Sequence, residues 1–174
     1  DRYIQPGESV LDVGCGTGLL LELTQEKAGY LAGIDISLGM LKQARRKLHR
    51  SHGDHLIAAD CRALPLGKTF DKILSSFMLV ILPYEDQKRV IASLASLLTS
   101  QGALVFLSAR EDFSPEWLSK DRWRDVCSEA GLNRIQIVDL YDYYRIVVAD
   151  RNLVDWEENR ILETDLVAPM ASQS

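Results

Sequence analysis

The chain of 174 residues is 47% hydrophobic and 26% charged, the composition of one soluble globular domain without room for a second full domain. Its net charge of -5 argues against nucleic acid as a partner, because proteins that bind nucleic acid by neutralising its phosphates need a clustered basic surface. Cys15, Cys61 and Cys127 form no Cys-x-x-Cys pair, so we expect no disulfide framework or zinc clip, and a reducing, cytoplasmic setting. No apolar run reaches the ~20 residues that span a bilayer, and no signal peptide opens the sequence, so no membrane association is expected.

Strand and helix patterns alternate along most of the chain, which predicts a parallel sheet. Apolar runs predict strands at 8–13, 30–34, 54–59, 70–76, 103–108, 134–140 and 143–149. Helical spacing predicts helices at 19–27, at 38–48 after a Ser37 cap, and at 85–98 before Gly102. A further helix is predicted from a cap at Ser114 to Gly131, with a short helix near 153–162. The short link before residue 143 permits an antiparallel hairpin between the last two strands.

The most informative stretch is VLDVGCGTG at residues 10–18, where a buried strand runs into Gly14, Gly16 and Gly18 and then into a helix. Alternate glycines let the backbone approach a ligand closely, and a helix start offers unpaired N–H groups. The dinucleotide-binding fingerprint carries its third glycine one residue later, so this spacing favours a cofactor without a pyrophosphate. A glycine-rich turn without a ligand is the alternative interpretation.

A carboxylate follows the second predicted strand, at Asp35 in the sequence GIDIS. It lies at roughly the ~20-residue separation expected for an acid that accepts hydrogen bonds from ribose hydroxyls. A helix-capping role is the alternative, but Ser37 is better placed to cap the next helix.

Five stretches in this order resemble the class I S-adenosylmethionine-dependent methyltransferases, most closely their small-molecule branch. They are VLDVGCGTG at 10–18, GIDIS at 33–37, AADC with LPL at 58–66, FDKILSS at 70–76, and residues 98–107 with Gln101-Gly102. The resemblance covers residues 5–150. It implies an α/β fold, a Rossmann-like three-layer sandwich with a seven-stranded, mostly parallel sheet and an antiparallel C-terminal hairpin. We assign residues 1–150 to this domain and 151–174 to a C-terminal tail.

The resemblance also implies which residues hold the cofactor, S-adenosylmethionine. Asp12 would lie near the methionine amino group, Asp35 would hold the ribose and Asp60 would accept a hydrogen bond from the adenine amino group. An alternative for Asp60 is a loop acid that caps the turn after the third strand. The other expected cofactor-binding residues are Gly14, Cys15, Gly16, Gly18, Ile36, Met40, Cys61, Ser76 and Phe77. Asp71 belongs to the motif but opens a strand at the opposite edge, so we interpret it as structural.

The sequence excludes some classes of methyl acceptor but does not identify the acceptor itself. The sequence SSFMLVILP at 75–83 lacks the Asn-Pro-Pro-aromatic motif of many amide and base N-methyltransferases, so DNA and glutamine amino groups are disfavoured as acceptors. Arg110, Tyr84, Tyr143 and Tyr144 are candidates for the acceptor pocket, although each residue type is more often a surface or packing residue. No catalytic base is assigned.

Two other patterns are interpreted as structural. His49, His52 and His55 have three-residue spacing, but they precede the third strand, away from the carboxyl ends where ligands bind, so no metal site is expected. The basic run at 42–50 reads as the solvated face of an amphipathic helix.

The sequence is compatible with three functions. The first is a methyltransferase acting on an O, N, C or S atom of a small molecule, and the second is a cofactor-binding module without activity that serves as a partner or regulatory subunit. The third, an NAD-dependent enzyme, is disfavoured by the glycine spacing. Relatives usually carry one or two helices before the first strand that cover the cofactor and shape the acceptor site. We therefore expect that a lid in the full protein or a partner chain, such as a second copy in a homodimer, covers this site, or that the pocket is open to a large acceptor.

Overall fold

The computed structural model describes residues 3–48, 55–110, 114 and 117–151, and the elements of this part of the chain alternate as the sequence predicts. The strands are β1 (Ser9–Val13), β2 (Tyr30–Asp35), β3 (Leu56–Ala58), β4 (Phe70–Ser76), β5 (Leu98–Ala109), β6 (Arg134–Leu140) and β7 (Tyr144–Asp150). The helices are α1 (Leu19–Thr24), α2 (Leu38–Lys47), α4 (Tyr84–Ser96) and α5 (Lys120–Glu129), with a 3-10 helix η1 (Leu79–Ile81).

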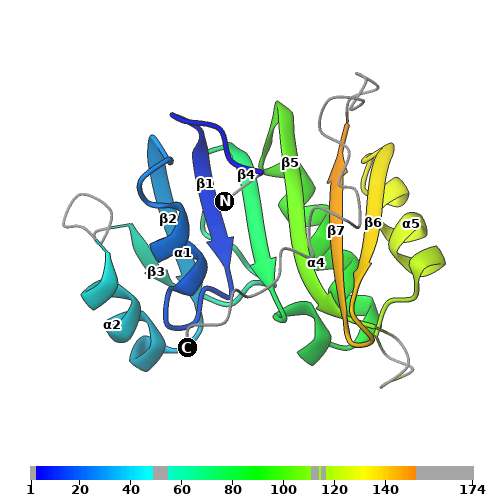
Figure 1. Ribbon diagram of the computed structural model, residues 1–174, viewed down its shortest axis with the longest axis horizontal. Helices are drawn as coiled ribbons and strands as arrows, with labels where there is room; N and C mark the ends of the chain where they lie inside the picture. The colour runs from blue at the N-terminus through cyan, green and yellow to red at the C-terminus, as the bar shows by residue number, and fades with distance from the viewer. Residues whose placement is uncertain (1–2, 49–54, 111–113, 115–116, 152–174) are drawn as a thin grey trace, which may run out of the picture.

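The strands form a single sheet in the order β3-β2-β1-β4-β5-β7-β6 (Figure 1). β1 pairs in parallel with β2 and β4, and parallel pairing continues outward to β3 and β5. β7 is inserted between β5 and β6 and runs antiparallel to both. The predicted seven-stranded, mostly parallel sheet with an antiparallel C-terminal hairpin is therefore confirmed.

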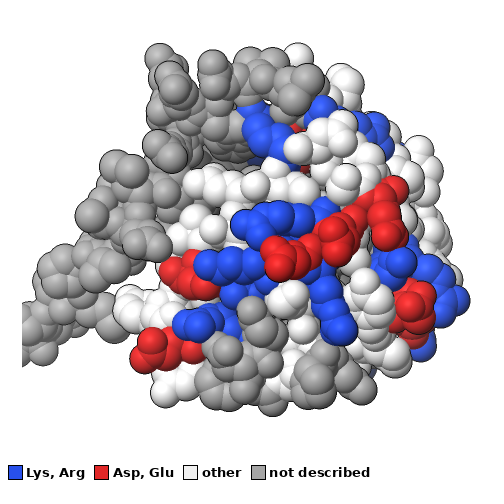
Figure 2. Space-filling model, turned by 90° about the vertical axis from the view of Figure 1, so that its right-hand side faces the viewer, with Lys and Arg blue, Asp and Glu red and all other residues white. Residues whose placement is uncertain are grey.

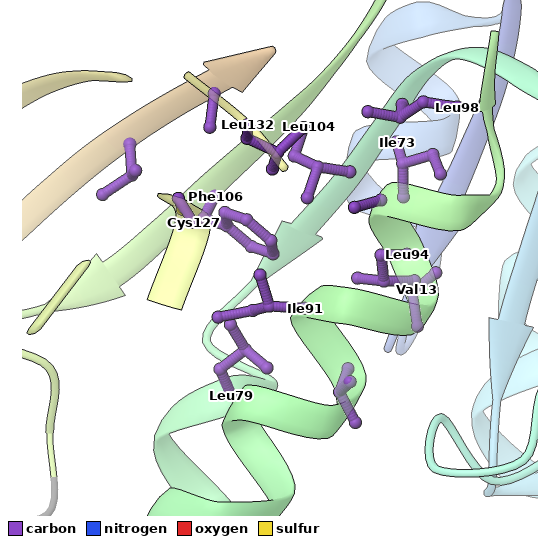
Figure 3. Packing of buried hydrophobic residues seen from close by; sticks show 14 of the residues in the cluster. Val13, Ile73, Leu79, Ile91, Leu94, Leu98, Leu104, Phe106, Cys127 and Leu132 are labelled. Atoms are coloured by element: carbon purple, nitrogen blue, oxygen red, sulfur yellow. The ribbon is translucent and has the colours of Figure 1, made fainter. Parts of the chain in front are cut away.

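Helices cover both faces of the sheet, which gives the three layers (Figure 1). Val10 of β1 belongs to an apolar cluster with Leu21 of α1 and Leu41 of α2. On the other face, α4 and α5 pack on a larger cluster, in which Figure 3 shows Ile91, Leu94 and Cys127 beside Val13, Ile73, Leu104 and Phe106. Because side chains alternate across a strand, successive residues of β1 pack into apolar clusters on opposite faces of the sheet. Both faces of the sheet are therefore packed against helices below the strand ends that carry the site.

Asp71 joins three strands at the amino-terminal edge of the parallel strands. One of its carboxylate oxygens, Oδ2, accepts hydrogen bonds from the Ser9 backbone N–H at 2.9 Å and from the Ser9 hydroxyl at 2.7 Å. Its Oδ1 accepts from the Thr99 hydroxyl at 3.0 Å. Burial opposes ionisation of Asp71, but these hydrogen bonds outweigh it and lower the pKa. This geometry supports the structural interpretation of Asp71.

The start of β5 differs from the prediction. The helix before it ends at Ser96, and the strand begins at once with Leu98, which pairs with Phe70 of β4. Gly102 therefore lies inside the strand rather than beyond a helix end. A Cβ atom at Gly102 would lie 2.8 Å from the Phe70 carbonyl oxygen, so glycine is required by close contact with the neighbouring strand.

The start of α5 also differs from the prediction. The Ser119 hydroxyl accepts a hydrogen bond from the Arg122 N–H at 3.3 Å and caps a helix that begins at Lys120. Ser114 instead belongs to a turn, in which its carbonyl accepts from the Trp117 N–H at 3.1 Å. The prediction of a cap at Ser114 was wrong because a serine followed by proline also begins turns.

Charges of both signs interleave on the side of the molecule that carries α5 (Figure 2). The ion pairs there include Lys120–Asp139 at 2.7 Å, Arg124–Asp121 at 2.8 Å and Lys88–Glu129 at 3.0 Å. The described part of this face therefore presents no basic stripe without acidic neighbours. Among the described helices, none is long and apolar enough to cross a bilayer. The predicted helix near 153–162, as well as His49 and His52, lies outside the described residues.

Candidate functional site

A cavity of about 450 Å³ opens at the carboxyl ends of β1 to β4. This is the edge at which ligands bind in open α/β sheets, and it lies at the lower side of Figure 1, toward which β1 and β4 run. The lining residues come from four strand ends and the loops that follow them. They are Gly14, Ile34, Asp35, Ile36, Ala59, Asp60, Cys61, Arg62, Ser76, Phe77, Met78, Ile81, Leu82 and Pro83.

The glycine loop is shaped by two packing contacts. Gly14 has φ +75°, and a Cβ there would lie 2.6 Å from the Met78 Cβ, so the loop passes directly against the chain after β4. Gly18 has φ +78°, and its Cβ would lie 2.8 Å from the Ala44 Cβ of α2. Gly16 differs, because its Cβ would meet no heavy atom within 4 Å. Close packing therefore accounts for Gly14 and Gly18, whereas Gly16 faces open space.

Asp35 connects the end of β2 to the glycine loop. Its Oδ2 accepts a hydrogen bond from the Gly16 N–H at 2.8 Å, and its Oδ1 accepts from the Ser37 N–H at 2.8 Å. Ser37 itself caps α2 by accepting from the Met40 N–H at 3.3 Å, so Asp35 is not needed as the cap. Each carboxylate oxygen accepts about two hydrogen bonds, which leaves Asp35 acceptor capacity toward the cavity.

Asp12 is a buried carboxyl in the middle of the sheet. It is 1% exposed and lies in β1 between Gly33 of β2 and Leu74 of β4. Burial, and then the charge of Asp35, raise the pKa of Asp12 to about 7. Among the described residues, its Oδ1 has no hydrogen-bond partner. A buried acceptor in this state is stabilised by any cation or N–H donor that reaches it.

Asp60 lines the cavity after β3 and is held by Arg62. The Asp60 Oδ1 accepts from the Arg62 backbone N–H at 2.9 Å and from its Nε at 3.0 Å. The Asp60 Oδ2 accepts from Nε at 3.0 Å and from Nη2 at 2.5 Å. These hydrogen bonds from Arg62 lower the pKa of Asp60 to about 2, so this carboxylate is ionised at neutral pH.

Both cysteines of the predicted site are unreactive thiols. Cys15 is buried, and its Sγ lies near Gly33 within the core cluster of α1 and α2, so its side chain is not among those lining the cavity. Burial, then the charges of Asp12 and Asp35, raise the pKa of Cys15 to about 12. Cys61 lines the cavity, and burial raises the pKa of its thiol as well. Neither supplies a thiolate nucleophile near neutral pH.

Only some of the predicted cofactor-binding residues lie at the cavity wall. Those at the cavity wall are Gly14, Asp35, Ile36, Asp60, Cys61, Ser76 and Phe77. Asp12 lies beneath the site, and Gly18 packs between α1 and α2. Met40 is 42% exposed in the first turn of α2 and is not among the residues that line the cavity.

An aromatic group lies beside the cavity at the ends of β4 and β7. Phe77 has φ 55°, which is uncommon for a residue other than glycine, and its N–H donates to the Leu107 carbonyl at 2.8 Å. Its ring makes an edge-on contact with Tyr144, with 5.5 Å between centroids, and the Tyr143 ring lies 6.3 Å from that of Tyr144. Tyr144, a candidate for the acceptor pocket, therefore contacts the lining residue Phe77, and the candidate Tyr143 lies next to Tyr144.

The other two candidates for the acceptor pocket have different positions. The Arg110 N–H donates to the Tyr143 carbonyl at 3.0 Å, and its Nη1 donates to the Tyr141 carbonyl at 3.4 Å, which places Arg110 beside the aromatic group. Tyr84 opens α4, where the Arg122 guanidinium lies 5.0 Å from its ring centroid. Tyr84 thus packs toward α5 and is not a lining residue.

The structure describes part of each of the two patterns that the sequence analysis interpreted as structural. The His55 ring lies 4.6 Å from that of Tyr30, and the described residues contain no cluster of His, Cys, Asp and Glu able to hold a metal ion. Lys42, Arg45 and Arg46 are exposed on α2, as expected for a solvated face.

Sequence reasoning missed Arg62 and the wall formed by Met78, Ile81, Leu82 and Pro83. The signal for Arg62 was its position two residues after a carboxylate at a strand end. The signal for the wall was its location just after β4, at the carboxyl edge of the sheet where ligands bind. Ile36 and Ile81 are 71% and 78% exposed, so two large apolar side chains stand open at the cavity.

Comparison with known proteins agrees with this geometry. Residues 10–102 match the family model described as a methyltransferase domain. The malonyl-[acyl-carrier protein] O-methyltransferase of Enterobacter lignolyticus is 29% identical over 126 residues, which are 72% of this chain and 47% of the relative. The dTDP-3-amino-3,4,6-trideoxy-alpha-D-glucopyranose N,N-dimethyltransferase of Streptomyces venezuelae is 34% identical over 117 residues, or 65% of this chain and 48% of the relative. This chain thus spans about half the length of these curated relatives.

A similar crystal structure is that of magnesium protoporphyrin IX methyltransferase from Synechocystis PCC 6803 with bound S-adenosylmethionine. Its sequence identity is 27% and its TM-score 0.67, with 84% of this chain and 71% of that chain covered.

Proposed function

This chain belongs to the methyltransferase domain family, and on that premise we propose that it binds S-adenosylmethionine in the cavity at the ends of β1 to β4. It then transfers the methyl group to an O, N, C or S atom of a small-molecule acceptor. The observation that carries the proposal is a cavity lined from four strand ends, with a buried carboxyl oxygen of Asp12 beneath it that has no partner within the described part of the chain.

The residues present fit such a cofactor. A cavity of about 450 Å³ falls within the usual ~300–1,000 Å³ of ligand pockets. Asp12, Asp35 and Asp60 supply negative charge and acceptors for a ligand that carries a cationic sulfonium, an ammonium group, ribose hydroxyls and an aromatic amine. Exposed Ile36 offers an apolar contact for a purine ring. We assign the ribose to Asp35, the purine amino group to Asp60 and the ammonium group to Asp12.

When bound, the cofactor supplies a methyl carbon already activated by the positive sulfonium. The chain's own residues orient the ligand and exclude water, and proximity of this kind contributes several kcal/mol, up to ~7–11 in favourable systems. Among the described residues that line the cavity, none is a histidine, lysine, tyrosine or glutamate.

The names of the relatives leave the acceptor atom open, since one is an O-methyltransferase and another an N,N-dimethyltransferase. Phe77 lines the cavity and contacts Tyr144, so we place the acceptor beside this aromatic group. We retain residues 1–150 as the domain and propose that a further chain segment, or a second chain, covers the cavity. A cytoplasmic setting is supported by the free thiols of Cys15, Cys61 and Cys127.

Calorimetry with S-adenosylhomocysteine, S-adenosylmethionine and NAD tests the cofactor. Micromolar binding of the first two ligands without binding of NAD is expected, and selective binding of NAD would refute the proposal. A radiolabelled methyl-transfer assay over a panel of small O, N, C and S nucleophiles then tests activity. Cofactor binding without transfer to any compound would favour the binding module over the enzyme.

A further inference from the structure

The exposed aromatic side chains of the described residues gather at one place, beside the cavity. They follow β4 or β6, or begin β7, and they are Phe77, Tyr141, Tyr143 and Tyr144. Because Tyr144 pairs with Ala109 at the end of β5, the turn before β7 lies at the same carboxyl edge of the sheet as the cavity. The other aromatic residues in the described part of the chain are partly or fully buried.

Two of these residues have an unusual backbone conformation. Phe77 and Tyr141 each have φ 55°, and among the described residues no others except glycines have a positive φ. Glycine adopts this conformation without strain, whereas a bulky side chain does so at a cost. Their side chains are 36% and 70% exposed, so packing in the core does not account for them. Residues held in such strained conformations cluster at ligand sites, and these two lie at one edge of the sheet.

Three of the rings form a continuous aromatic group that starts at the cavity. Phe77 lines the cavity, its ring centroid lies 5.5 Å from that of Tyr144, and the Tyr143 ring lies 6.3 Å from that of Tyr144. Both separations fall within the ~4.5–7 Å at which aromatic rings attract one another. The Phe77 N–H donates to the Leu107 carbonyl at 2.8 Å, which holds the first ring of the group at the strand end. A further planar ring beside Phe77 would extend the group into the cavity.

The cavity wall next to the aromatic group is apolar. Among the described residues that line the cavity, the charged ones follow β2 or β3, and they are Asp35, Asp60 and Arg62. Beyond Ser76, the lining residues that follow β4 are all apolar, namely Phe77, Met78, Ile81, Leu82 and Pro83. A charged group at this wall would lose hydration without a charged partner in the wall, whereas an apolar ring would be stabilised by leaving water.

Building on the proposed function, we infer that the methyl acceptor carries a planar aromatic ring that packs against Phe77 and contacts the aromatic group. A saturated ring of the same size buries similar apolar area but lacks the charge distribution of a π-system, so contacts with phenylalanine and tyrosine favour the planar ring. Tyr144 is then a specificity-determining residue. In the transfer, an electron pair of the acceptor forms the bond to the methyl carbon, the carbon–sulfur pair returns to sulfur, and a proton on the reacting atom leaves to water.

The test compares two bicyclic alcohols with the same carbon skeleton, planar 2-naphthol and saturated decahydro-2-naphthol. Their binding is measured by calorimetry on the full chain saturated with S-adenosylhomocysteine, so that the cofactor part of the cavity is filled. The wild type is expected to bind 2-naphthol about tenfold more tightly than the saturated alcohol. Tyr144→Leu is expected to lose about fivefold in affinity for 2-naphthol and less than about twofold for the saturated alcohol.

Two further variants and two physical measurements separate ring recognition from other effects. Tyr144→Phe keeps the ring and should retain the preference for 2-naphthol. Leu23→Gln alters a second, apolar cavity of about 170 Å³ that is lined by α1 and β5, and it should leave both affinities unchanged. Tyr144 does not line the cofactor cavity, so Tyr144→Leu should bind S-adenosylhomocysteine as the wild type does. Thermal melting should agree within a few degrees, and sedimentation should give one oligomeric state for all variants.

Several outcomes would overturn the inference. If S-adenosylhomocysteine binds but the two alcohols bind equally well, or neither binds, the acceptor is not selected by a planar ring, although the proposed function stands. An unchanged preference in Tyr144→Leu would exclude the aromatic group, and a loss in Leu23→Gln would locate the probe in the second cavity. A wild-type dimer that Tyr144→Leu dissociates without a change in alcohol binding would assign the rings to a protein interface. If S-adenosylhomocysteine itself does not bind, the proposed function fails and the inference with it.

Discussion

Replacing Asp12 with asparagine tests how much the ionisation of this buried carboxyl destabilises the fold. The Asp12 Oδ1 has no hydrogen-bond partner among the described residues. The folded chain raises its pKa from 3.8 to about 7, so it holds this proton more tightly than the unfolded chain does. The stability associated with this proton is fully present below pH 3.8, falls as the pH rises, and is lost once the pH has passed 7. At 1.36 kcal/mol for each pH unit, the loss amounts to about 4 kcal/mol.

Asparagine has nearly the same shape and does not ionise, so Asp12→Asn escapes this loss. Urea unfolding followed by circular dichroism should show the variant gaining on the wild type by about 3 kcal/mol between pH 5 and pH 8. Asp71→Asn is the matched control, because the pKa of Asp71 is lowered and the carboxylate stays ionised in both states over this range. Its stability difference from the wild type should therefore not change with pH.

The same substitution should weaken ligand binding, because a cationic ligand favours the ionised form of Asp12. Affinity for S-adenosylmethionine should rise from pH 6 to pH 8 in the wild type and stay flat in Asp12→Asn, as measured by calorimetry. A stability gain in the variant that is equal at pH 5 and pH 8 would refute the reasoning, since it would show that Asp12 does not titrate in this range.

Further predictions concern ribose binding, a buried ion pair and a helix start. Asp35→Ala should lower affinity for S-adenosylhomocysteine about 100-fold in calorimetry, since two hydrogen bonds of about 1.5 kcal/mol each are lost; unchanged affinity would exclude the ribose assignment. Arg145→Met should destabilise the fold by about 2 kcal/mol in urea unfolding, because the 2% exposed arginine loses its hydrogen bonds to Asp139 at 2.6 Å and to the Leu118 carbonyl at 3.1 Å, while Asp139 keeps its ion pair with Lys120. Ser119→Ala should cost about 1 kcal/mol in the same assay, because the Ser119 hydroxyl caps α5, and unchanged stability would contradict this cap.

The elements that were predicted well have strong local signals. The strand at Phe70–Ser76 was predicted with the observed bounds because its apolar core is followed by two serines at the strand end. Asp35 was predicted as a site residue because it follows a predicted strand at the expected distance from the glycine loop, and Asp60 because of the resemblance to the methyltransferase family; both line the cavity. For the strand and for Asp35, the local sequence was a sufficient signal.

The features that were missed depend on contacts between distant segments. The early start of β5 depends on pairing between Leu98 and Phe70, which no local pattern in residues 97–102 reveals. The contact between Arg62 and Asp86 likewise requires knowing that the loop after β3 faces the start of α4. Local periodicity carries no information about such neighbours.

The antiparallel hairpin has a consequence for how this architecture diversifies. Because β7 returns along β5, the turn at Tyr141–Tyr143 lies near Arg110, beside the aromatic ring of Phe77, while the ladder hydrogen bonds of both strands lie behind it. With the acceptor placed as we propose, insertions or exchanges in this turn would change the surface that the acceptor contacts and would leave the hydrogen bonds of the sheet intact. On that proposal, acceptor preference and folding depend on different stretches of the chain, so one can change in evolution while the other is preserved.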